Sequence, residues 1–265
     1  MQIRLPKDVR ENLLPDNLLL LGYRGSVSHN TFIPDTDPDS TDDVDLLGFY
    51  FAPPEYYLGL GKGKIYKKAW EKFVGQWDVV CYEYRKVVGM LMNCNPNVMS
   101  MLWLGENHYL PTNTPYGWAG QLLVDNRDAF TSKKAYNSYT GYAHSQLKKM
   151  TAHNKEGYMG AKRKALVDKY GYDTSNASHL IRLLKMGIEF LSTGQLNVFR
   201  KDAPMLVDIK RGEWPLERVH AEADRLFVLS EEALVRSTLP DLPDEARIES
   251  LVMDTLTKYL GEIER

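Results

Sequence analysis

The sequence has little of what marks several specialised classes of protein. It contains only two cysteines, Cys81 and Cys94, and no zinc-binding Cys/His pattern surrounds them. The N-terminal region has no signal-peptide core, and its longest apolar run, Leu18 to Leu21, is far too short to cross a membrane. These absences argue against a disulfide scaffold or a zinc module. They favour a cytoplasmic chain that works in a reducing setting and away from membranes.

Excess charge of one sign is also missing. The formal net charge is -2, so the whole molecule is not a basic nucleic-acid binder, and any contact with a polyanion requires a local basic patch. Apolar residues make up 43% of the chain and charged residues 26%, which is ordinary for a globular protein. A length of 265 residues allows one large domain or two smaller ones.

The first half of the chain alternates strand-like and helix-like segments. Apolar runs at residues 18–21, 46–51 and 78–82 predict buried strands. Residues 85–92 and 97–104 are typical of helices, and Pro96 stands just before the second of these, where a missing N–H costs little. This interleaving predicts a small unit of mixed α and β structure.

After about residue 125 the pattern becomes helical. Residues 175–191 form the clearest helix, because Asp173 or Thr174 can cap its start and Gly194 can close its end. The other expected helices cover residues 133–150, 216–237 and 245–262. The sequence therefore predicts two domains, residues 1–125 and residues 126–265.

The first predicted strand runs into a short polar turn that begins with Gly25-Ser26. Glycine permits unusual dihedral angles and a close approach of the backbone to a ligand. Backbone N–H groups and the Ser26 hydroxyl can then hold phosphate oxygens. The turn is therefore a candidate phosphate-binding site.

Two carboxylates precede the second predicted strand. Asp43 and Asp45 are two positions apart, and side chains at such positions share one face of a strand. Mg²⁺ prefers a few carboxylates together with phosphate oxygens and water, so this pair predicts a Mg²⁺ or Mn²⁺ site. A third carboxylate would complete it. Asp78, at the start of the next strand, is the first choice, and Glu83 is the alternative.

The acidic stretch also has simpler interpretations. It could be a solvated loop or a calcium loop. An EF-hand that starts at Asp35 would need glycine at its sixth position and glutamate at its twelfth, but Ser40 and Leu46 stand there. The EF-hand is therefore excluded, whereas the solvated loop stays open.

The motif Gly25-Ser26-x-Ser28-x-x-Thr31, followed by Asp43-x-Asp45-x-x-Gly48, resembles the signature of the DNA polymerase β nucleotidyltransferase superfamily. More closely, the chain is similar to the RlaP-type family of the predicted RNA repair pathway. There are two departures: residues 33–40 look inserted, and Asp42 stands where serine is expected. The similarity continues through Tyr82-Glu83-Tyr84-Arg85-Lys86, Asn95-Pro96-Asn97, Phe130-Thr131-Ser132-Lys133-Lys134, Tyr170-Gly171-Tyr172-Asp173, Ser178-His179-Leu180-Ile181-Arg182 and Lys210-Arg211-Gly212-Glu213-Trp214.

This resemblance implies an α+β fold, with a small mixed-sheet domain like the polymerase β palm followed by an all-helical domain. It implies an enzyme that transfers a nucleoside monophosphate from an NTP to an acceptor hydroxyl and releases pyrophosphate. Asp43, Asp45 and Asp78 would be the catalytic metal ligands. Gly25, Ser26, Ser28, Thr31, His179 and Arg182 would bind the nucleotide. RNA is the expected acceptor, whereas the choice of NTP and the oligomeric state stay open.

Two alternatives belong to other classes of function. The chain could nucleotidylate a protein, as minimal antitoxin-like members of the superfamily do, or it could be an inactive nucleotide-binding module. The presence of both Asp43 and Asp45 argues against the inactive module. A local basic patch favours RNA over a protein acceptor.

That basic patch occupies the middle of the chain. Its lysines and arginines are interleaved with tyrosines, a mixture that suits phosphate contact and base stacking. A charged helix exterior over a tyrosine-lined core would give the same pattern. Residues 154–160 resemble a loop. The basic residues are Lys133, Lys134, Lys148, Lys149, Lys155, Lys162, Arg163, Lys164 and Lys169.

A second basic feature lies on the predicted helix 175–191. His179, Arg182 and Lys185 recur at spacings of three and so share a face. They could form a positive wall toward the triphosphate, with Arg182 as its clamp. Alternatively, Arg182 or Lys185 could form a salt bridge with Glu189.

Overall fold

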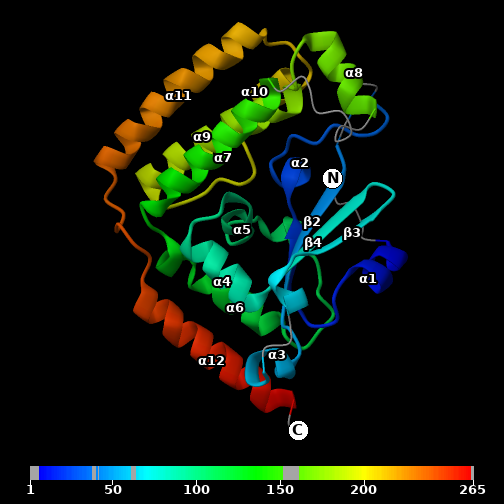
Figure 1. Cartoon of the computed structure of the whole chain (residues 1–265), viewed down its shortest axis with the longest axis vertical. Helices are drawn as coiled ribbons and strands as arrows, with labels where there is room; N and C mark the ends of the chain where they lie inside the picture. Colours follow the sequence, from blue (N-terminus) through cyan, green and yellow to red (C-terminus); the bar gives the residue numbers. More distant parts are fainter. Residues whose placement is uncertain (1–5, 38–39, 41, 61–63, 152–160, 264–265) are drawn as a thin grey trace.

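The computed structural model describes residues 6–37, 40, 42–60, 64–151 and 161–263. Its first half is built on a mixed sheet, which lies beside the helices (Figure 1). The sheet has four strands in the order β1-β2-β4-β3. The inner pair, β2 and β4, runs parallel, whereas β1 and β3 are antiparallel to their neighbours. The strands are β1 (Leu18–Tyr23), β2 (Val44–Tyr50), β3 (Trp70–Val74) and β4 (Trp77–Glu83).

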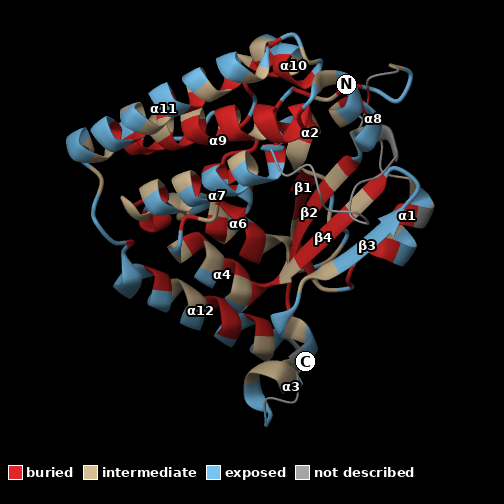
Figure 2. Ribbon diagram, turned by 45° about the horizontal axis from the view of Figure 1, so that its top comes forward, coloured by how far each residue is buried: buried red, intermediate tan, exposed pale blue. Residues whose placement is uncertain are grey.

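The two faces of the sheet bury different sets of side chains, because successive residues of a strand point to opposite sides. On β2, Val44 and Leu46 belong to one apolar cluster, and Leu47 and Phe49 belong to the other. Helix α1 (Lys7–Leu13) covers the first face, and the helices of the rest of the chain cover the second (Figure 2). Asp45 has the parity of Leu47, so it points toward the helical side.

Short helices connect and cover the sheet in the first half. Helix α6 packs against β1, and Gly120 lies so close to the Leu19 carbonyl that a Cβ would meet the oxygen at 2.2 Å. The helices here are α2 (Gly25–Ser28), α3 (Pro54–Leu58), α4 (Tyr84–Met92), α5 (Pro96–Met101) and α6 (Gly117–Asp125), and the 3-10 turns are η1 (Lys64–Lys67), η2 (Glu106–His108) and η3 (Arg127–Phe130).

The second half is helical, as the sequence predicts. Its centre is α9, which Asp173 caps by accepting a hydrogen bond from the Asn176 N–H at 2.9 Å and which ends at Gly194 in the left-handed conformation. Its helices are α7 (Lys134–Thr151), α8 (Ala161–Tyr170), α9 (Thr174–Thr193), α10 (Ala203–Lys210), α11 (Leu216–Arg236) and α12 (Glu245–Ile263). No helix in the described part of the chain is long and apolar enough to span a bilayer.

The last helix returns to the first half of the molecule (Figure 1). The Tyr259 ring of α12 stacks on Phe51 with centroids 4.0 Å apart, and its hydroxyl donates to the Ala52 carbonyl at 3.0 Å. One apolar cluster therefore extends from Leu19 in β1 to Tyr259. The domain boundary at residue 125 stays a prediction.

The fold is α+β, as predicted, and each of the predicted strands and helices is present. Strand β3 was not predicted from the sequence. Its residues WEKFV are mostly exposed at the edge of the sheet, so they carry no apolar pattern that would mark a buried strand (Figure 2). The predicted helix 97–104 ends earlier, at Met101. The predicted loop at residues 154–160 lies outside the described residues.

Candidate active site

Asp45 and Asp78 face each other at the starts of the two parallel strands. The register pairs Asp45 of β2 directly with Asp78 of β4. Both side chains point to the face of the sheet that the helices cover. Leu47 and Val80, two positions further along the same strands, belong to the apolar cluster on that face. Strand β1 runs the other way and therefore ends beside these starts, where the Arg24 N–H donates to the Asp45 carbonyl at 3.0 Å. The sheet thus joins the Gly-Ser turn to the carboxylates.

The carboxylates are close enough to affect one another. Burial, together with repulsion from Asp78 and Asp43, raises the pKa of Asp45 to about 7, against the opposing effect of Arg24. Asp43 is exposed and lies one residue before β2. The structure therefore brings Asp43, Asp45 and Asp78 into one electrostatic cluster.

A cation already lies between two of these carboxylates. Arg24 Nη2 donates to Asp78 Oδ2 at 2.8 Å and lies 3.5 Å from Asp45 Oδ1. In the described residues, no group of three or more His, Cys, Asp or Glu side chains is arranged to hold a metal ion. Mg²⁺ nevertheless needs only one or two carboxylates when phosphates and water supply its other ligands. Asp45 and Asp78, bridged by a guanidinium, fit such a cation.

The Gly25-Ser26 turn is shaped by the adjacent carboxylate. Gly25 has φ +61°, and a Cβ placed there would lie 2.0 Å from Asp45 Oδ2. Glycine thus permits both the left-handed conformation and the position of Asp45. The Ser26 hydroxyl is buried and has no hydrogen-bond partner among the described residues. A buried hydroxyl without a partner is costly unless a ligand engages it.

The other two hydroxyls of the motif act inside the turn. Ser28 Oγ donates to the Gly25 carbonyl at 3.0 Å, and Thr31 Oγ1 donates to the Ser26 carbonyl at 3.5 Å. Both residues are buried. They therefore hold the conformation of the turn, and direct contact of either with a nucleotide stays a prediction.

Gly25→Ala tests whether this position must lack a side chain. We expect the variant to lose most divalent-ion binding, because the new methyl group collides with the Asp45 carboxylate, and to lose about 1–2 kcal/mol of stability through left-handed strain. Gly75→Ala is the matched control, since Gly75 also has φ +61° but has nothing within 4 Å of its Cβ position. Thermal unfolding and Mn²⁺ titration measure both effects. Equal Mn²⁺ binding by the two variants would contradict the steric argument.

The alternative third carboxylate, Glu83, lies elsewhere. It is at the opposite end of β4 from Asp78, roughly 16 Å away at about 3.3 Å per residue. Its carboxylate caps α4 by accepting from the Arg85 and Lys86 N–H groups at 3.0 and 3.1 Å, and it accepts from the Tyr57 hydroxyl at 2.6 Å. Glu83 therefore stabilises the fold at a distance from the cluster. Of the two candidates, only Asp78 joins it.

Helix α9 supplies a positive group to the same region. Burial, with repulsion from Arg200, lowers the pKa of Arg182 to about 10, and the Asp45 carboxylate opposes that shift. Arg182 therefore stays charged at neutral pH and lies within electrostatic range of Asp45. No carboxylate of the described residues lies within ion-pair distance of it. The predicted salt bridge from Arg182 to Glu189 is absent, because Glu189 instead pairs with Arg200 at 2.7 Å.

The other two basic residues of that helix face behave differently. Lys185 pairs with Asp202 at 2.8 Å, so its charge is already compensated within the helical half. His179 precedes Arg182 by almost one turn and lies near His29, where burial is the main cause of a lowered pKa and the His179 charge adds to it. The structure therefore groups His179 and Arg182, but not Lys185, near the Gly-Ser turn.

His29 is a functional candidate that sequence reasoning missed. It is buried directly after α2; its Nδ1 lies 2.9 Å from the Val198 carbonyl, and its Nε2 contacts Arg182 Nη1. Burial and the nearby Arg182, His179 and Arg200 charges lower its pKa well below the usual value. The only sequence signal was its place in the same short motif as Ser26.

The low pKa of His29 makes stability depend on pH. In the unfolded chain, His29 takes up a proton near pH 6.5, whereas in the folded protein it stays neutral to well below that value. Protons therefore favour unfolding as pH falls below about 6.5, by up to about 1.4 kcal/mol per pH unit. We expect His29→Gln to flatten this slope in denaturant titrations, with no difference in slope above pH 6.5. Parallel slopes for variant and wild type on the acid side would refute the assignment.

Lys210 and Asp42 form a second contact that the sequence did not suggest. Lys210 Nζ lies 2.6 Å from both Asp42 oxygens and donates to the Thr31 carbonyl at 3.1 Å. The two side chains are only 4% and 11% exposed. Asp42 Oδ2 also accepts from the Ile33 N–H at 2.8 Å. Asp42, which stands where the resemblance leads us to expect serine, thus links residues 33–40 to the helical half through Lys210.

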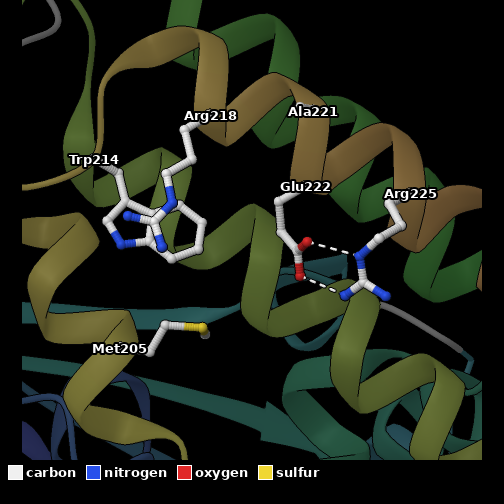
Figure 3. Close-up of a pocket in the computed structure, with 6 residues that line it drawn as sticks. All are labelled: Met205, Trp214, Arg218, Ala221, Glu222 and Arg225. Atoms are coloured by element: carbon white, nitrogen blue, oxygen red, sulfur yellow. Dashed lines mark hydrogen bonds and ion pairs between the residues drawn. The ribbon is translucent and has the colours of Figure 1, made fainter.

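A hollow of about 450 Å³ lies in the helical half, between α10 and α11 (Figure 3). Arg218 lies 3.7 Å over the Trp214 ring, and Arg225 is paired with Glu222 at 2.7 Å. Its charged groups are therefore already partnered, and none of its lining residues belongs to the strands that carry Asp45 and Asp78. The hollow is separate from the candidate active site.

The basic middle segment is divided between core and surface. Tyr139 and Tyr172 are buried, which agrees with a tyrosine-lined core. In contrast, the lysines at the end of α7 and on α8 are exposed: Lys148, Lys149, Lys164 and Lys169. The described part of the segment therefore offers an exposed positive surface, on which Tyr142 is also exposed.

The mixed sheet places two facing carboxylates beside a Gly-Ser turn, with a helical region on the same side, which agrees with the arrangement that the sequence resemblance implies. A family model described as "RlaP: RNA repair pathway DNA polymerase beta family" matches residues 36–254. The chain belongs to this family. The match includes Asp43, Asp45, Asp78 and Arg182, and it begins after the Gly25-Ser26 turn.

A nucleotidyltransferase-like protein from Exiguobacterium sibiricum 255-15 is similar over 86% of this chain and 72% of its own, with 11% identity and a TM-score of 0.29. No curated protein matches the chain.

Proposed function

We propose that the protein is a metal-dependent nucleotidyltransferase that moves a nucleoside monophosphate from an NTP to a hydroxyl of RNA and releases pyrophosphate. The observation that carries this proposal is the pairing of Asp45 with Asp78 beside the Gly25-Ser26 turn. The carboxylates and the turn come from different strands, and the sheet register brings them together. Membership of a polymerase β family of RNA repair supports the reaction class.

Each group of the site has a place in this reaction. Asp45 and Asp78 would hold Mg²⁺ or Mn²⁺, and Asp43 would add its negative charge from the same electrostatic cluster. The bound ion would lower the pKa of the attacking hydroxyl and offset charge on the phosphates. The unpartnered Ser26 hydroxyl is available to a phosphate oxygen, and Gly25 lets the backbone approach it. Arg182, with His179 beside it, provides positive charge for the remaining phosphates.

RNA is the proposed acceptor for two reasons. The family is described by its place in an RNA repair pathway. In addition, the exposed lysines of α7 and α8 provide local positive charge in a molecule whose net charge is -2. Such a patch can contact a polyanionic backbone without sequence preference.

The test is transfer of label from each α-labelled NTP, with Mg²⁺ or Mn²⁺, into total RNA and cell lysate. The proposal predicts label that ribonuclease removes and protease does not, and that Asp43→Ala/Asp45→Ala abolishes. Label removed by protease would indicate protein nucleotidylation instead. Equal background labelling by wild type and the double variant would identify an inactive module and would overturn the proposal.

A further inference from the structure

We infer that His29 is a positioning residue that aims Arg182 at the triphosphate. This inference rests on the proposed function. It starts from a partly buried arginine that has no carboxylate partner in the described residues, although its neighbour Lys185 is paired with Asp202. A buried guanidinium charge is costly unless an anion compensates it. The position of Arg182 near Asp45 makes the polyphosphate of the substrate the natural anion.

The hydrogen bonds of His29 fix its protonation state. The Val198 carbonyl can only accept, so the Nδ1 that lies 2.9 Å from it carries the hydrogen. Nε2 is then unprotonated and accepts from Arg182 Nη1. An imidazolium would instead point an N–H at the arginine. The low pKa of the buried ring agrees with the neutral form.

The contact joins the parts that must be aligned in the reaction. His29 lies directly after α2, so its backbone is continuous with the Gly25-Ser26 turn, and its N–H donates to the Gly25 carbonyl at 3.2 Å. Arg182 comes from α9, and Val198 follows that helix. A displacement of the turn would therefore displace the guanidinium with it. His29 acts through Arg182 and needs no contact with the nucleotide.

Two substitutions separate positioning from simple packing. Asparagine can reproduce the group at Nδ1 and keep the Val198 bond, but it lacks the acceptor for Arg182. Glutamine reaches the place of Nε2 and can keep that acceptor. We expect His29→Asn to weaken binding of NTP and of inorganic tripolyphosphate about tenfold, as the loss of one charge-assisted hydrogen bond implies. His29→Gln should bind nearly as well as wild type.

A double-mutant cycle supplies the decisive readout. Binding is measured by calorimetry with Mn²⁺, tripolyphosphate and each NTP, so no turnover is needed. Arg182→Met should weaken binding by about a hundredfold, and His29→Asn should add nothing in that background. In turnover assays, His29→Asn should raise KM with little change in kcat.

Three results would overturn the inference: additive losses from His29→Asn and Arg182→Met, equal losses from His29→Asn and His29→Gln, or no binding of either ligand by wild type. Failure of the proposed function looks different. A wild type that binds tripolyphosphate and NTP in a His29-dependent way but transfers no label would keep the positioning role and refute the nucleotidyltransferase.

Discussion

Asp45→Asn should reduce nucleotide transfer by about a thousandfold or more while leaving the protein folded. The loss is large because metal-based stabilisation of developing charge is worth several kcal/mol. Asp45 faces Asp78 in the parallel register, and neither an amide nor a protonated carboxyl group can replace the charge that a divalent ion requires. We expect the loss to appear mainly in kcat at saturating NTP.

The fold should tolerate this change. Burial and the neighbouring carboxylates already raise the pKa of Asp45 to about 7, so the metal-free protein accepts a neutral side chain there. Thermal unfolding without metal should therefore be nearly unchanged. The stabilisation that Mn²⁺ gives to wild type should disappear. Glu83→Gln is a control that perturbs a buried carboxylate outside the cluster. It should lower stability through α4 and leave metal binding intact.

Lys210→Met should lower the free energy of unfolding by about 3–5 kcal/mol. The variant leaves the Asp42 carboxylate buried without its cation, although the Ile33 N–H still donates to it. It also removes the donor to the Thr31 carbonyl, in the segment that directly follows the Gly25-Ser26 turn. Denaturant titration measures the loss.

Arg211→Met is the matched control for this prediction. Arg211 is the next residue and pairs with Asp37 of the same segment at 2.6 Å, but its side chain is 45% exposed. An exposed pair contributes about 0–1 kcal/mol. In addition, Asp42→Asn should restore part of the stability of Lys210→Met, since it removes the uncompensated charge. Equal losses from Lys210→Met and Arg211→Met would contradict a special role for the buried pair.

The sheet core and the major helices could be predicted because their signals are local. The apolar runs of β1, β2 and β4 mark buried strands, and Asp173 with Gly194 marks the limits of α9. The sequence ranked Asp78 above Glu83 because Asp78 starts its strand, whereas its position opposite Asp45 follows from the strand register, which only tertiary pairing sets. Glu83 gave no warning of its capping role, because glutamate is not among the preferred N-cap residues.

The contacts that complete the site are not local. His29 contacts Val198 and Arg182, which lie 169 and 153 residues away in the sequence. Lys210 contacts Asp42, which lies 168 residues away. No periodicity or spacing rule reports such pairs. Arg24 was also overlooked, because a single arginine beside a glycine has no pattern, yet the sheet places its guanidinium between Asp45 and Asp78. Asp42 illustrates the same limit: what looked like a departure from a motif is half of a buried ion pair.

The central claim is that Asp45 and Asp78 hold a divalent ion beside Ser26. Anomalous scattering from crystals grown with Mn²⁺ and a non-hydrolysable NTP tests it most directly. The account predicts a manganese peak coordinated by Asp45 and Asp78, a triphosphate oxygen on the Ser26 hydroxyl, and the Arg24 guanidinium displaced from the two carboxylates. A bound nucleotide with no manganese at these carboxylates, and with Arg24 still bridging them, would contradict it.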